Sequence, residues 1–158
     1  MLTLIIGPNN SGKSAYAESI IADLESTKRY YIATMIPYGE EGQARVKKHL
    51  KMRANLGMET IEDPYLEKVD DIANGADVLL EDVSNLVANR LFEKGPEACD
   101  NIVQEIISLN EKVSNLVVVS IGGIVNDGYD EETVDYITRL NQINEELMEL
   151  AEQVINRE

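Results

Sequence analysis

A short glycine-rich segment near the start of the chain carries the clearest chemistry. Residues 7–14 read GPNNSGKS and fit the phosphate-binding pattern GxxxxGK[ST]. Its glycines let the backbone wrap closely around an anion, so that successive N–H groups point at phosphate oxygens. Lys13 is expected to reach the β- and γ-phosphates, and Ser14 to ligate Mg²⁺. The motif predicts a nucleoside triphosphate site formed by Gly7, Pro8, Asn9, Asn10, Ser11, Gly12, Lys13 and Ser14.

The alternative is a glycine-containing turn that matches the pattern by chance. The apolar run before it, at residues 2–6, suits a buried strand, and residues 13–25 have apolar side chains at helical spacing. This strand–loop–helix order is the setting that the pattern requires. It also directs the helix N-terminus and its dipole at the phosphates. The setting favours the nucleotide interpretation.

The only histidine, His49, lies in the basic segment ARVKKHLKMR at residues 44–53. An imidazole nitrogen is a competent nucleophile, and a basic helix in a chain of net charge −15 suggests a face that meets an anion. The alternative is a surface histidine without a chemical role, among basic side chains that pair with the chain's many carboxylates. Both interpretations are open at this point.

Two acidic residues, Glu81 and Asp82, follow the apolar run DVLL. Proteins with a phosphate-binding loop commonly place an acid at such a strand end, near Mg²⁺. For Glu81 we weigh a metal or ribose contact against a helix N-terminal acid. For Asp82 we expect the helix cap.

Apolar runs and helical spacings alternate along the whole chain. Apolar runs predict strands at residues 2–6, 30–34, 59–62, 77–80 and 116–121. Helical spacing predicts helices at residues 13–25, 44–55, 63–73, 83–93, 98–113 and 130–156, with a loop marked by Pro37, Gly39 and Gly42. The alternation predicts an α/β fold of the three-layer P-loop NTPase type, in one domain over residues 1–158, with a mostly parallel sheet and helices on both faces.

Composition indicates which classes of partner the protein can bind and in which compartment it is expected. The charge of −15 and a pI near 4.4 argue against nucleic acid, so that a small anion would need a local positive pocket. Cys99 is the only cysteine, which excludes an intrachain disulfide and suits a reducing compartment. No apolar run approaches the length of a membrane span. We therefore expect a cytoplasmic protein.

Several motifs in order resemble the bifunctional adenosylcobinamide kinase / adenosylcobinamide-phosphate guanylyltransferase family of cobalamin biosynthesis. The loop GPNNSGKS is shared by many families, whereas RVxxHxxxR after a YIAT strand is far more specific. The matching segments are GPNNSGKS, YIAT at residues 31–34, ARVKKHLKMR at 44–53, TIE at 60–62, LLEDVSNLVANRLF at 79–92 and INEELMELAEQV at 143–154.

The resemblance implies two reactions at one nucleotide site. GTP or ATP would phosphorylate the hydroxyl of a cobinamide-type substrate, and His49 would then attack the α-phosphate of GTP to form a guanylyl-histidine. The resemblance further implies that Arg53 and Lys51 steady the phosphates and that the protein forms a homotrimer. Mg²⁺ would bridge the phosphates, with Ser14 and Glu81 as its expected ligands. The positions implied around the nucleotide are Thr34, Glu62 and Glu81.

The sequence also departs from the family pattern. Ser120 and Ile121 replace an Asn-Glu pair, and Met52 and Ala54 replace a glycine and a proline. After the segment INRE the family's last apolar strand is missing, so either the sheet lacks an edge strand or the chain is a shortened member. Two other functions therefore stay open: a P-loop kinase for another small metabolite, and a diverged nucleotide-binding protein without catalysis.

Overall fold

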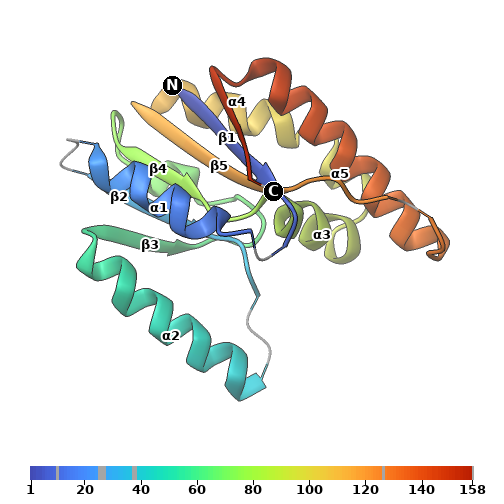
Figure 1. The fold of residues 1–158 in the computed structure, drawn as a ribbon, viewed down its shortest axis with the longest axis horizontal. Coiled ribbons are helices and arrows are strands. Elements are labelled where there is room, and N and C mark those ends of the chain that lie inside the picture. Colours follow the sequence, from blue (N-terminus) through green and yellow to red (C-terminus); the bar gives the residue numbers. More distant parts are fainter. Residues whose placement is uncertain (10, 25–27, 37–38, 126, 158) are drawn as a thin grey trace.

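A six-stranded sheet forms the centre of the computed structural model, which describes residues 1–9, 11–24, 28–36, 39–125 and 127–157 (Figure 1). The strand order is β3-β2-β4-β5-β1-β6, and all the pairings are parallel. The strands are β1 (Leu2–Gly7), β2 (Arg29–Ala33), β3 (Met58–Glu62), β4 (Asp77–Leu80), β5 (Asn115–Ile121) and β6 (Gln153–Asn156). Because the strands are parallel, the segments that follow them meet at one edge of the sheet.

Helices cover both faces of this sheet, as the alternating pattern predicts. They are α1 (Lys13–Asp23), α2 (Gly39–Asn55), α3 (Val83–Glu93), α4 (Ile102–Lys112) and α5 (Glu131–Leu150), with short 3₁₀ helices at Val69–Asp71 and Pro96–Cys99. On one face α3, α4 and α5 bury Leu86, Ile106 and Leu140 against the sheet. On the other face α1 buries Ala17 and Ile21. The predicted α/β architecture is confirmed.

Successive side chains of β1 enter different cores. Leu4 packs with α3, α4 and α5, whereas its neighbour Ile5 packs with α1. Both are completely buried. A strand buried on both faces reads as a continuous apolar run, which is why LTLII predicts β1 correctly.

Helix α2 differs from the other helices because it covers neither face of the sheet and lies beside the edge strand β3 (Figure 1). It begins at Gly39, so the predicted start at residue 44 is wrong, and the expected loop residues Gly39 and Gly42 are helical. Pro37 falls outside the described residues. Glu40 and Glu41 occupy the first turn of α2, where carboxylates are favourable beside the helix dipole.

The helix predicted at residues 63–73 is wrong. The Asp63 carboxylate accepts hydrogen bonds from the backbone N–H groups of Glu67 and Lys68, both at 2.7 Å. Leu66 adopts a φ of 57°, which interrupts any right-handed helix. Only the 3₁₀ turn at Val69–Asp71 forms in this region. Asp63 therefore organises a loop, and the sequence Asp-Pro does not begin a helix here.

The helix predicted at residues 130–156 is too long. Helix α5 ends at Leu150 and the chain continues as β6, which pairs with β1. Val154 packs against the core of α3 to α5, and Ile155 packs against the core of α1. Neighbouring side chains point to opposite faces of a sheet only in an extended segment. The expectation that the sheet lacks an edge strand after β1 is therefore wrong.

The end of β6 closes tightly on the phosphate-binding loop. The backbone N–H of Arg157 donates to the Ile6 carbonyl at 2.9 Å. A Cβ atom at Gly7 would lie 2.0 Å from the Arg157 carbonyl oxygen, which leaves no room for a side chain. In the described part of the chain, no helix has both the length and the apolar character needed to span a bilayer.

Substitution of Asp63 by alanine should destabilise the protein by about 2 kcal/mol, because two hydrogen bonds to a carboxylate are lost. Asp63 is 2% exposed, whereas the Glu67 side chain on the same loop is largely exposed. Urea unfolding measures the change. The control Glu67→Ala should stay within about 0.5 kcal/mol of the unsubstituted protein, and equal effects of the two substitutions would contradict the role of Asp63.

Candidate active site

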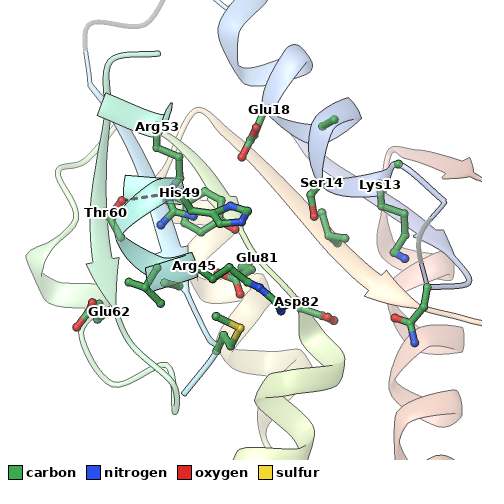
Figure 2. A pocket seen from close by; sticks show the side chains of 18 of the residues that line it. Lys13, Ser14, Glu18, Arg45, His49, Arg53, Thr60, Glu62, Glu81 and Asp82 are labelled. Atoms are coloured by element: carbon green, nitrogen blue, oxygen red, sulfur yellow. Dashed lines mark hydrogen bonds between the residues drawn. The ribbon is translucent and has the colours of Figure 1, made fainter. Parts of the chain in front are cut away.

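A cavity of about 380 Å³ opens where the carboxyl ends of the strands meet, between the phosphate-binding loop and α2 (Figure 2). Its walls come from segments far apart in the sequence. The lining residues are Asn9, Ser11, Gly12, Lys13, Ser14, Ala15, Glu18, Tyr31, Ala33, Met35, Arg45, Val46, His49, Arg53, Thr60, Glu62, Glu81, Asp82 and Val119. The two motifs that the sequence singled out, GPNNSGKS and ARVKKHLKMR, therefore face one space.

The phosphate-binding loop turns into α1 at Gly12, which has a φ of 77° and accordingly suits glycine. No side chain caps the N-terminus of α1, so its first backbone N–H groups are available to an anion. Ser11 and Lys13 both donate side-chain hydrogen bonds to the Pro8 carbonyl, at 2.8 and 2.6 Å. Asn10 lies outside the described residues, and Gly7 and Pro8 do not line the cavity.

Lys13 is the cation of this loop, and it is 8% exposed. Burial lowers its pKa, and the nearby charge of Asp82 opposes that shift. The ammonium group therefore lacks full solvation in the empty cavity. A phosphate oxygen near Nζ would supply the counter-charge that burial makes favourable.

Four residues of α2 line the cavity: Arg45, Val46, His49 and Arg53. Arg45, His49 and Arg53 are spaced four residues apart. This spacing puts them on one face of the helix. Three other basic residues of this helix are exposed and do not line the cavity: Lys47, Lys48 and Lys51. Lys51, which the resemblance implied as a phosphate contact, therefore lies outside the cavity.

Arg53 is the only buried side chain of α2 among those that the structure describes, and it is 3% exposed. Its guanidinium carbon lies 3.8 Å from the centre of the Tyr31 ring, and its Nε donates to the Thr60 hydroxyl at 3.2 Å. The Tyr31 hydroxyl in turn hydrogen-bonds to the Glu81 carboxylate. One arginine thus joins a polar helix to β2 and β3.

The two acids after β4 have different surroundings. Glu81 faces Tyr31 and Arg53; burial raises the pKa of Glu81, while Tyr31 and Arg53 oppose the shift. Asp82 caps α3, as predicted, because its carboxylate accepts from the backbone N–H of Ser84 at 2.9 Å. Burial also raises the pKa of Asp82, against the opposing hydrogen bonds from Ser84 and the charge of Lys13.

Thr34 is completely buried and does not line the cavity. Its hydroxyl donates to the Asp82 carbonyl at 3.1 Å, and its own carbonyl accepts from the Asn89 side chain at 2.7 Å. Glu62, in contrast, lines the cavity with an exposed side chain. Of these two expected nucleotide contacts, the structure brings Glu62 to the cavity and uses Thr34 to join β2 to the start of α3.

The cavity contains both signs of charge, so the local positive pocket expected at the phosphate-binding loop is bordered by carboxylates. Its cations are Lys13, Arg45 and Arg53, and its carboxylates are Glu18, Glu62, Glu81 and Asp82. Within the described residues, no group of three or more acidic, histidine or cysteine side chains forms a ready-made metal cage. A few oxygen ligands near a phosphate site suit Mg²⁺, which is usually held by one or two carboxylates together with substrate phosphates.

A family model described as cobinamide kinase / cobinamide phosphate guanyltransferase matches residues 3–157. The chain belongs to this family. The bifunctional adenosylcobalamin biosynthesis protein CobU of Escherichia coli (strain K12) is 32% identical to it over 123 residues. The alignment covers 74% of this chain and 66% of the E. coli protein, slightly less than two thirds of the relative's length.

Sequence reasoning missed several residues that line the cavity. Arg45 was visible only as one of many basic residues, although its spacing of four residues from His49 marks it as a neighbour on the same helix face. Tyr31 and Thr60 carry no signal of their own. Glu18 follows Ser14 by one helical turn, and this spacing could have placed it beside the nucleotide.

Replacing Arg53 with methionine should loosen α2. Methionine keeps an apolar stem but loses the contact with the Tyr31 ring and the hydrogen bond to Thr60, and a desolvated cation–π contact is worth about 2 kcal/mol. Backbone amides of α2 should exchange with deuterium about 30-fold faster. The control Lys51→Met changes an exposed cation of the same helix and should leave exchange unaltered. Unchanged exchange in Arg53→Met would refute the anchoring role.

Replacing Glu81 with glutamine should change how stability depends on pH. Because burial raises the pKa of Glu81 in the folded protein, the folded state binds this proton more tightly than the unfolded chain does. The corresponding stability is present at low pH and is lost as pH rises through the folded-state pKa. Glu81→Gln should therefore become progressively more stable than the original protein as the pH rises above 4.5, the ordinary pKa of a glutamate.

Urea unfolding at several pH values measures this difference. Glu62→Gln removes an exposed carboxylate from the same cavity and should change the free energy of unfolding by less than about 0.5 kcal/mol at each pH measured. A constant difference for Glu81→Gln would show that burial does not raise the pKa of Glu81.

Proposed function

We propose that the protein phosphorylates a cobinamide-type substrate and then transfers a guanylyl group to the phosphate, as a cytoplasmic enzyme of cobalamin biosynthesis. The observation that carries this proposal is the single cavity shared by the phosphate-binding loop and His49. A kinase needs only the loop, whereas a covalent nucleotidyl transfer needs a nucleophile in the same space. Family membership and the E. coli relative, whose name describes a bifunctional protein, support the same assignment.

In the first reaction, a substrate hydroxyl attacks the γ-phosphorus of GTP or ATP. An oxygen–phosphorus bond forms, the bond to the β-phosphate oxygen breaks, and the nucleoside diphosphate leaves with the electron pair. The hydroxyl proton is released to water. Lys13 would exchange the Pro8 carbonyl for phosphate oxygens, and the backbone N–H groups at the start of α1 would bind the same anion. The chain's role in this step is to bind and orient the phosphates.

In the second reaction, a neutral nitrogen of His49 attacks the α-phosphorus of GTP. A nitrogen–phosphorus bond forms and pyrophosphate leaves with the electrons of the broken bond. The phosphate of the substrate then attacks the guanylyl phosphorus, and the electrons of the nitrogen–phosphorus bond return to His49. One displacement is thereby divided into two easier ones.

Mg²⁺ fits the oxygen ligands of this cavity and would offset the phosphate charge in both reactions. Ser14 would hold it, together with Glu81 or Asp82. Asp82 is the acid whose charge acts on Lys13, which favours it over Glu81 for the phosphate end. A homotrimer remains the expectation from the family resemblance.

Ser120 and Ile121, which depart from the family pattern, are not among the residues that line the nucleotide cavity. Ser120 is completely buried, and its hydroxyl hydrogen-bonds to the Asn144 side-chain oxygen at 2.6 Å. Asn144 also donates to the Ile121 carbonyl at 3.0 Å. These residues join β5 to α5, so their identities leave the proposed nucleotide chemistry intact.

Incubation with Mg²⁺ and GTP labelled at the α-phosphate should leave acid-labile label on the denatured protein. His49→Ala should reduce this label to background, because the nucleophile is gone. Lys47→Ala removes an exposed cation of the same helix outside the cavity and should label normally.

GTP binding is measured in parallel for all three proteins. A protein that binds GTP without becoming labelled would refute the covalent route and favour a kinase of another metabolite or a nucleotide-binding protein.

A further inference from the structure

The two arginines that flank His49 on the cavity face of α2 are in different states. Arg53 is buried, stacked on Tyr31 and hydrogen-bonded to Thr60. Arg45 is exposed, and it makes no hydrogen bond, ion pair or ring contact with any residue that the structure describes. Of the two, Arg45 is therefore the one whose guanidinium donors are available to a ligand.

Arg45 is also directed at the cavity. It lies one helical turn before His49 on the same face of α2, a spacing at which neighbouring side chains meet, and it lines the cavity. Figure 2 shows its side chain extending toward Asp82, while the His49 ring points across the cavity on the side of Ser14. The described structure gives no ion pair between Arg45 and Asp82, so neither the cavity nor the helix surface neutralises this cation.

We propose that Arg45 binds the pyrophosphate portion of GTP and stabilises it as the leaving group when His49 is guanylylated. This inference rests on the proposed function. When the nitrogen of His49 bonds to the α-phosphorus, the electrons of the broken phosphorus–oxygen bond pass to pyrophosphate, which gains negative charge. A guanidinium fork can donate two hydrogen bonds to phosphate oxygens, which makes arginine better suited than lysine to this position.

The carboxylates of the cavity would repel a bound triphosphate, so that a further cation would stabilise its binding. The β- and γ-phosphates bound at Lys13 would lie in a cavity that also holds four carboxylates. Arg53 is already held by Tyr31 and Thr60 and faces the charge of Glu81. Arg45 thus supplies, on the helix that carries the nucleophile, a positive charge that no protein group in the described structure uses. The pairing of nucleophile and cation on one helix face orients both toward the same triphosphate.

The test measures pyrophosphate binding directly, by calorimetry with Mg²⁺ present, so that it does not depend on catalysis. Arg45→Ala should weaken binding about 30-fold, as expected for the loss of charge-assisted hydrogen bonds. Arg45→Lys keeps the charge without the fork and should lose less, about fivefold. Lys47→Ala removes one cation from the opposite side of α2 and should bind pyrophosphate within twofold of the original protein.

A second arm follows the reverse reaction on guanylylated protein, in which added pyrophosphate regenerates GTP. Arg45→Ala should raise the half-saturating pyrophosphate concentration, again about 30-fold, while release of the guanylyl label by acid stays unaltered. Because Arg45 is exposed and alanine favours helix, the variant should keep its fold, which circular dichroism checks.

The outcomes separate the two proposals. If the original protein forms the guanylyl-histidine but Arg45→Ala binds pyrophosphate normally, the inference about Arg45 is overturned and the proposed function stands. If no guanylyl-histidine forms, the proposed function fails, and the calorimetric arm still decides whether Arg45 binds pyrophosphate. Equal losses in Arg45→Ala and Lys47→Ala would mean that only the total charge matters, which also overturns the inference.

Discussion

The contact between Arg53 and the Tyr31 ring governs the position of the helix that carries His49. Helix α2 is polar along its length and packs chiefly against β3, so it lacks the apolar stripe by which α3, α4 and α5 adhere to the sheet. A buried guanidinium costs desolvation energy unless its surroundings compensate. Here the ring face of Tyr31, the hydroxyl of Thr60 and the charge of Glu81 do so. The helix that carries His49 is therefore held by a polar contact within the cavity itself.

This arrangement ties the helix to the electrostatics of the cavity. The whole chain is strongly acidic, and the cavity itself contains four carboxylates beside its cations. Two of them, Glu81 and Asp82, have pKa values raised by burial. In the proposed function, a triphosphate would therefore be bound by directional donors: the N–H groups at the start of α1, Lys13 and the arginines of α2. Such a site discriminates by geometry more than by net charge.

The features that the sequence predicts well are local ones. The phosphate-binding loop depends on a contiguous motif, and the central strands are buried on both faces, so each is a recognisable apolar run. The loop after β3 was mispredicted because Asp63 followed by proline also begins many helices, and only the backbone bonds to Glu67 and Lys68 decide between the two. Strand β6 was mispredicted because Val154 satisfies the helical spacing of α5 as well as the alternation of a strand. Among the site residues, the sequence could not predict that Arg53 is buried while Lys51 is exposed. The difference depends on where α2 lies relative to Tyr31, which is set by tertiary packing.

The close approach of Arg157 to Gly7 has a consequence for how the phosphate-binding loop works. Because the Arg157 backbone, directly after β6, occupies the space behind the first glycine, Gly7 cannot move toward β6. A loop held in this way would lose less conformational freedom on binding an anion. The edge strand thus supports the phosphate-binding loop from behind. Glycine at position 7 is needed for the close packing of strand and loop as much as for a close approach to phosphate.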